Sequence, residues 1–113
     1  MTGAAQNQNF VIYVRNFTVT PGPRMKEDGE YSGEEFRKRH LAPGLQNAVR
    51  KKACLTVVLD GTMGYGAAFL EEAFGGLVRA GHSKQTLRDH LRVVSRDRPW
   101  YEPEVDFYIS GAA

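Results

Sequence analysis

One stretch of the sequence, from Cys54 to Ala80, changes from a strand pattern to a helix pattern within a few residues. Cys54–Leu59 is short and almost wholly apolar, which predicts a central strand covered on both faces. Three glycines and no proline follow before Ala68, so the chain can turn sharply there. Apolar residues then recur at helical spacing, at Phe69, Leu70, Ala73, Phe74, Leu77 and Val78. We therefore predict a strand, a tight loop and a helix that ends near Gly81.

Upstream of this stretch, the sequence predicts one strand and one helix. Phe10–Val19 shows alternating apolar residues, which predict a strand beside Cys54–Leu59 that ends at Pro21. Ser32 begins a capping-box pattern with Glu35, so a helix is expected to begin at Gly33. Pro43 falls inside that helix and predicts a kink or a break into two pieces.

Downstream, the pattern predicts a short helix over His82–Leu91 with Ser83 as its N-cap, then a short strand over Arg92–Ser95. The aromatic last segment favours a helix over a strand, although Pro103 is expected to interrupt it. Gly75-Gly76 lies inside the central helix, where each glycine costs about 1 kcal/mol relative to alanine. This pair therefore predicts that a backbone or a bulky side chain packs closely against the helix.

Composition favours one globular domain over residues 10–113, preceded by a polar tail over 1–9 that we expect to be disordered. The formal net charge of +2 is too small to indicate nucleic-acid binding. The single cysteine, Cys54, is typical of a reducing compartment, and no apolar run approaches the ~20 residues that cross a bilayer. We therefore expect a cytoplasmic protein that does not bind a membrane.

Several short motifs resemble those of a STAS-like family of uncharacterised function, which is related to the STAS domains of bacterial anti-sigma factor antagonists. The resemblance implies an α/β (α+β) fold in which a mixed β-sheet carries helices mainly on one face. It covers about half of the chain. The motifs are Gly22-Pro23-Arg24, Asp28-Gly29, Ser32-Gly33-Glu34-Glu35-Phe36-Arg37 and Phe69-Leu70-Glu71-Glu72-Ala73-Phe74-Gly75-Gly76-Leu77-Val78-Arg79.

The resemblance also implies a function and a site. STAS domains dock a protein partner on the corner formed by the loop and the central helix, and by resemblance the partner would be an ATP-binding protein of the anti-sigma, histidine-kinase-like type. Ala67 and Ala68 stand where the best-known relatives have serines, so phosphorylation is not expected at those positions because alanine has no hydroxyl. The predicted partner-binding residues are Gly64, Tyr65, Gly66, Ala67, Ala68, Glu71 and Glu72, with Arg24 and Asp28 beside them.

Two other functions stay open. A small hydrolase or phosphate-processing enzyme would use Asp60 with Glu71 and Glu72, but the sequence lacks a second catalytic group, so we expect no enzymatic activity. Alternatively, a structural subunit would dimerise weakly through the aromatic C-terminal segment. His40, His82 and His90 are scattered and Cys54 has no companion at ligand spacing, so we expect neither a metal nor another cofactor.

Overall fold

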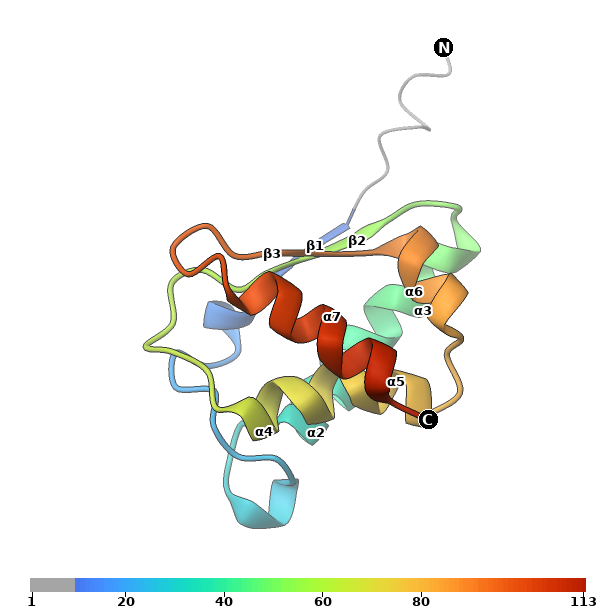
Figure 1. Cartoon of the computed structure of the whole chain (residues 1–113). Helices are drawn as coiled ribbons and strands as arrows, with labels where there is room; N and C mark the ends of the chain where they lie inside the picture. The colour runs from blue at the N-terminus through green and yellow to red at the C-terminus, as the bar shows by residue number, and fades with distance from the viewer. Residues whose placement is uncertain (1–9) are drawn as a thin grey trace.

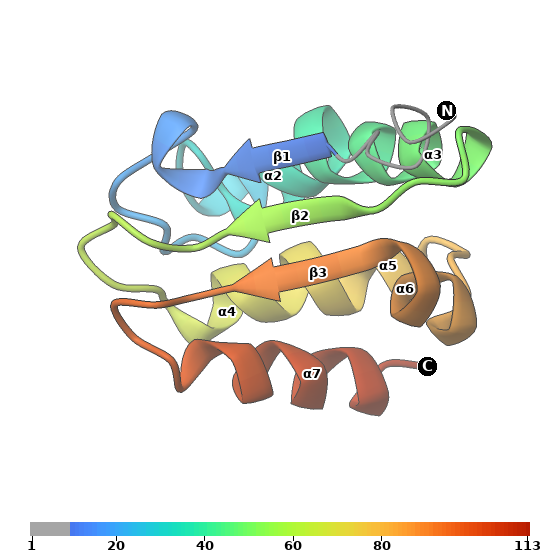
Figure 2. The same cartoon turned by 90° about the horizontal axis from the view of Figure 1, so that it is seen from above.

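The computed structural model describes residues 10–113, and it has the predicted α/β class. Strands β1 (Phe10–Tyr13), β2 (Leu55–Val58) and β3 (Leu91–Val94) form one sheet in the order β1-β2-β3. The predicted sheet was mixed, whereas these three strands all run parallel. The helices lie on one face of the sheet, as predicted (Figures 1 and 2). The tail predicted over 1–9 falls outside the described residues.

The first strand ends at Tyr13, so the prediction that it continues to Val19 is wrong. A 3₁₀ turn, η1 (Val14–Asn16), follows at once. Val14 is fully buried and Phe17 packs against the same core. Residues three apart point to opposite faces of a strand but to one side of a 3₁₀ turn, so the turn allows both side chains to reach the core.

Strand β2 occupies the centre of the sheet, as predicted, but only one of its faces is covered. Leu55 and Val57 are completely buried under the helices, while Thr56 and Val58 alternate with them and are partly exposed. The prediction that this strand is covered on both faces is therefore wrong for residues 10–113.

The predicted helix at Gly33 forms and does not break at Pro43. It is one continuous run of α2 (Gly33–Phe36), a π-helical turn η3 (Arg37–Leu41) and α3 (Ala42–Arg50), which we call the first helical run. Ser32 caps it by accepting the Glu35 N–H at 3.0 Å, whereas the Glu35 carboxylate binds Arg39 and does not complete the capping box. The Ala42 N–H reaches back five residues to the Arg37 carbonyl. This wider turn lies just before Pro43. It interrupts the i→i−4 hydrogen-bond pattern that proline, which lacks an N–H, would itself break.

The central helix is also interrupted by a π-helical turn. It consists of α4 (Ala67–Leu70), η4 (Glu71–Gly75) and α5 (Gly76–Arg79), which together we call the second helical run. Gly81 follows with φ of +110°, and the His82 N–H donates to the Leu77 carbonyl, so the predicted glycine cap is confirmed.

The remaining helices are α6 (Lys84–His90), capped by Ser83 as predicted, and α7 (Tyr101–Gly111). The last segment is thus helical, but the expected interruption at Pro103 is wrong. Pro103 lies in the first turn of α7, where the N–H that proline lacks has no partner within the helix. Helix α7 packs on η4 and buries Val105 completely.

The two helical runs approach each other unusually closely, and glycines make the approach possible. A Cβ atom on Gly33 would lie 2.5 Å from the Phe69 carbonyl oxygen, and one on Gly76 would lie 2.5 Å from Nε of Arg37. The close contact predicted at Gly75-Gly76 is therefore confirmed, and the bulky group is an arginine side chain from the first helical run. Phe36 and Phe69 pack beneath this contact with ring centroids 5.8 Å apart.

Replacing Gly33 with alanine is expected to lower the free energy of unfolding by about 1–3 kcal/mol, because the new methyl group meets the backbone of Phe69 and forces the runs apart. Gly111→Ala is the matched control, since nothing lies within 4 Å of its Cβ position and alanine favours a helix. Urea unfolding of both variants measures the difference. Equal stability of the two variants would contradict the close approach.

Candidate interaction site

The loop after β2, residues 60–66, is tied to the loop after β3, residues 95–100. Oδ1 of Asp60 accepts the backbone N–H groups of Arg96 at 2.6 Å and Asp97 at 2.8 Å. The Gly61 N–H in turn donates to the Asp97 carboxylate at 3.1 Å, which lowers the pKa of Asp97. Parallel strands place their carboxyl ends along one edge of the sheet, so these two segments, the carboxyl-edge loops, form one surface.

Tyr65 anchors this surface from within. Its hydroxyl donates to the Leu59 carbonyl at 2.8 Å, and its backbone N–H donates to the Tyr101 hydroxyl at 2.9 Å. The two tyrosine rings meet edge to face with centroids 5.0 Å apart. Burial raises the pKa of the Tyr65 phenol. The structure thus places Tyr65 at the base of the predicted site, where it joins α7 to the loop.

The other predicted loop residues lie where the chain enters the second helical run. Gly64 has φ of +114°, a backbone conformation that favours glycine, and its N–H donates to the Thr62 hydroxyl at 3.3 Å. The Gly66 N–H donates to the Pro21 carbonyl at 2.9 Å, which fixes the start of the helix. Ala67 is exposed and Ala68 is partly exposed, so the corner itself faces solvent.

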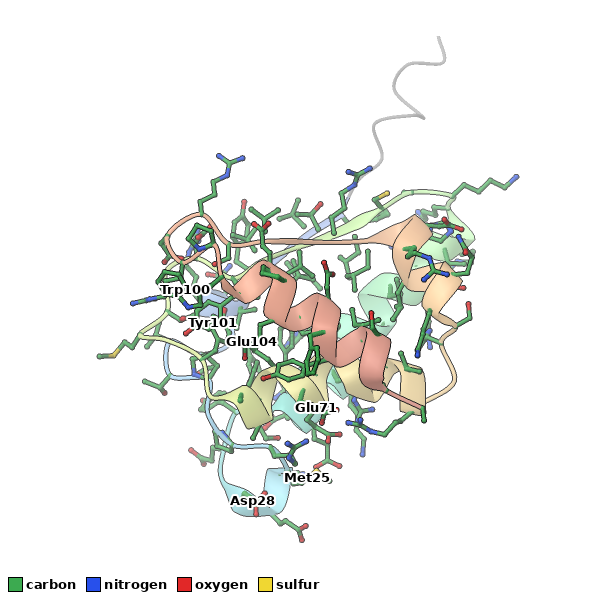
Figure 3. All side chains as sticks on the ribbon, viewed as in Figure 1. Met25, Asp28, Glu71, Trp100, Tyr101 and Glu104 are labelled. Carbon is green, nitrogen blue, oxygen red and sulfur yellow. The ribbon has the colours of Figure 1, made fainter. Side chains whose placement is uncertain are left out.

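Two large apolar side chains on the carboxyl-edge loops are exposed, and the sequence prediction did not include them in the site. Met63 is 77% exposed and Trp100 is 60% exposed. Their loops are held together beside them, since Arg98 donates to the Thr62 carbonyl at 3.0 Å. Figure 3 shows Trp100 and Tyr101 where α7 begins, at the same end of the molecule as this loop. One signal was present in the sequence: Met63 is a large apolar residue between the turn residues Thr62 and Gly64, outside the predicted strand and helix.

Glu71 and Glu72, also predicted site residues, belong to a network of ion pairs that we call the arginine–glutamate cluster. Arg37 donates to the Glu72 carboxylate at 2.8 Å and to its backbone carbonyl at 3.2 Å, which links the two helical runs. Arg79 binds Glu71 at 2.6 Å and Glu72 at 3.3 Å. Arg24 also pairs with Glu71, so it lies beside the predicted residues as expected. Sequence reasoning missed the roles of Arg37 and Arg79.

The π-helical turn η4 explains how Glu71 reaches Arg79. On a regular α-helix, residues seven apart are offset by about 20° around the axis and residues eight apart by about 80°. The extra residue in η4 makes up for one of the eight residues between Glu71 and Arg79, so the two side chains lie on nearly the same face. Hydrogen bonds from Arg79 and then Arg24 lower the pKa of Glu71, so its carboxylate stays ionised.

Asp28 has a local role. It lies in a 3₁₀ turn, η2 (Lys26–Asp28), where its carboxylate accepts the Met25 N–H at 3.2 Å. Figure 3 shows this turn at one end of the molecule, with Glu71 on the helix above it. Among the residues that the structure describes, the hydrogen bonds of Asp28 do not extend to the arginine–glutamate cluster or to the loop.

The three carboxylates of the predicted enzyme site belong to two separate networks. Asp60 binds backbone N–H groups, whereas Glu71 and Glu72 bind arginines. Within residues 10–113, no three side chains of metal-ligating type gather in one place. In the same range, no helix has the length and apolar character required to span a bilayer.

The family comparison agrees with these motifs. A family described as a STAS-like domain of unknown function matches residues 32–99, which is more than half of the chain. Neither a curated protein nor a solved structure matches the chain. The matched range spans both helical runs, two of the cluster's three arginines and the carboxyl-edge loops except Trp100. The chain therefore belongs to the family of STAS-like domains of unknown function.

Proposed function

We propose that this STAS-like domain is a non-catalytic regulatory module that binds another protein on the corner formed by the carboxyl-edge loops and the start of the second helical run. The observation that carries the proposal is the exposure of Met63 and Trp100 on a firmly hydrogen-bonded scaffold. Tryptophan is enriched among the residues that dominate binding energy, and methionine adapts to varied apolar surfaces. A rigid scaffold also reduces the entropy lost on binding.

The charged residues of the predicted site take a supporting role in this proposal. Glu71 and Glu72 are already paired with the arginines of the cluster, so their charges are less available to a partner. They fix the angle of the second helical run beneath the exposed corner. By family resemblance, the proposed partner is an ATP-binding protein of the anti-sigma, histidine-kinase-like type. Because Ala67 and Ala68 carry no hydroxyl, the proposed binding is not switched by phosphorylation at those positions.

Ala67→Glu is expected to abolish capture of this partner without unfolding the domain. Ala67 is the exposed first residue of α4. A negative charge there interacts favourably with the helix dipole, while the bulk of the glutamate side chain blocks the corner. Affinity capture from lysate of the native host, followed by mass spectrometry, measures the loss. Gln85→Glu is the matched control, because it adds the same side chain to the exposed first turn of α6.

The proposal requires an ATP-binding protein that is captured by the original chain and by Gln85→Glu, and lost by Ala67→Glu. Retention of every specific partner by a folded Ala67→Glu protein would exclude the corner as the site.

With the captured partner in hand, Met63→Ser is expected to weaken binding roughly thirtyfold, the effect of losing about 2 kcal/mol at a dominant contact. Isothermal titration calorimetry measures the affinity. Val49→Ser serves as the control because Val49 is also an exposed apolar residue but lies on α3. Similar affinities for the two variants would show that Met63 is not an anchor.

A second candidate function is self-association through α7. Trp100, Pro103 and Phe107 are exposed and spaced by three and four residues, so they form one apolar stripe along the helix. Phe107 is 74% exposed. This geometry suits the alternative in which the chain is a structural subunit.

For that alternative, light scattering over a range of concentrations is expected to show the mass rising from 12.6 kDa toward twice that value. Phe107→Ser removes the most exposed ring of the stripe and should keep the chain monomeric. A mass that does not change with concentration would reject self-association.

A further inference from the structure

The outer face of the sheet is bare in residues 10–113. Figure 1 shows α6 at one end of the sheet, the other helices below the sheet and no helix lying over its upper face, and Figure 2 looks directly onto the uncovered strands. Parallel sheets normally have both faces covered, because their strands are apolar on both sides. The strand register places two rows of side chains on this outer face: Val11, Thr56 and Arg92 in one, and Tyr13, Val58 and Val94 in the other.

These rows are largely apolar. Val11 is 49% exposed and Tyr13 is 37% exposed, while Val58 and Val94 are partly exposed beside them. Their partners on the opposite face, such as Leu55 and Val57, are fully buried under the helices. The strands therefore carry apolar residues on both faces of the sheet, but within residues 10–113 helices cover only one face.

Two arginines flank the apolar rows. The Arg15 guanidinium lies 4.4 Å from the centre of the Tyr13 ring and donates to the Asp60 carbonyl at 3.5 Å, beyond the carboxyl end of β2, and Arg92 stands on β3. None of the ion pairs among residues 10–113 involves either arginine. The outer strands lie about 10 Å apart, which is close to the diameter of an α-helix. A helix lying along β2 would thus meet one positive charge near the carboxyl end of the strands and one on its β3 side.

We propose that this outer face binds an amphipathic helix of a partner protein, with an apolar stripe against Val58 and Val94 and acidic residues facing Arg15 and Arg92. The four-residue strands are about 13 Å long, which matches about nine residues of helix. Charge complementarity with Arg15 and Arg92 selects acidic flanks over basic ones. This surface is separate from the corner proposed above, so each stands or falls independently.

The composition of the face favours a helix over single-stranded nucleic acid. Bases bind such faces by stacking on aromatic rings. Tyr13 is the aromatic residue of the two rows, and Arg15 already covers its ring. Valines provide no stacking surface, but they pack well against leucine and isoleucine of a helix.

NMR titration of the ¹⁵N-labelled full chain tests this proposal. The probes are two synthetic helical peptides of about five turns with the same leucine stripe, one flanked by glutamates and one by lysines, together with a single-stranded oligonucleotide. We expect the glutamate peptide to shift the amide signals of the outer-face rows. The lysine peptide and the oligonucleotide are expected to leave them unchanged.

Variants separate this surface from the corner. Arg92→Glu is expected to weaken binding of the glutamate peptide at least tenfold, while Ala67→Glu leaves it unchanged. Thr56→Lys provides a second block at the centre of the face if Arg92→Glu is unstable. Equal binding of both peptides, shifts confined to the carboxyl-edge loops, binding of the oligonucleotide, or concentration-dependent shifts of these rows without peptide would each overturn the proposal.

Discussion

The close approach of the two helical runs is the constraint on which the remaining structure depends. Each run follows a strand or leads into one, so the distance between the runs affects how the strands above them pair. Gly33 and Gly76 allow the contact, and Arg37 locks it by binding both the side chain and the carbonyl of Glu72. Charged groups that are removed from water require such matched partners. The family motif is therefore largely explained by packing between helices.

Local patterns predicted most of the fold. The apolar strand before Asp60, the helical spacing after it and the caps at Ser32 and Gly81 each depend on a few neighbouring residues, and each was confirmed. The errors arose where tertiary packing overrides local preference. Strand β1 stops at Tyr13 because Val14 and Phe17 must reach one core, and Pro43 is accommodated by a π-helical turn that no simple pattern indicates.

The candidate site was harder to predict because its geometry comes from contacts between distant segments. Asp60 accepts backbone N–H groups, but the donors come from the loop after β3, 36 and 37 residues away. Tyr65 is held by Tyr101 across the same distance in the sequence. Sequence spacing shows neither these bonds nor the exposure of Trp100 that results from them. Residue type alone could suggest Met63, but only the fold shows that it faces solvent.

The two π-helical turns differ in how they would tolerate a deletion. Each holds one residue more than a regular turn, so removing a single residue could restore a plain α-helix with its flanks in place. In η3 this change would press the Pro43 ring against the preceding turn. In η4 no proline intervenes, and Glu71 would then lie seven residues before Arg79 on a regular helix, still on the same face. The first turn is therefore tied to its proline, whereas the second would lose a residue and keep the ion pair between Glu71 and Arg79.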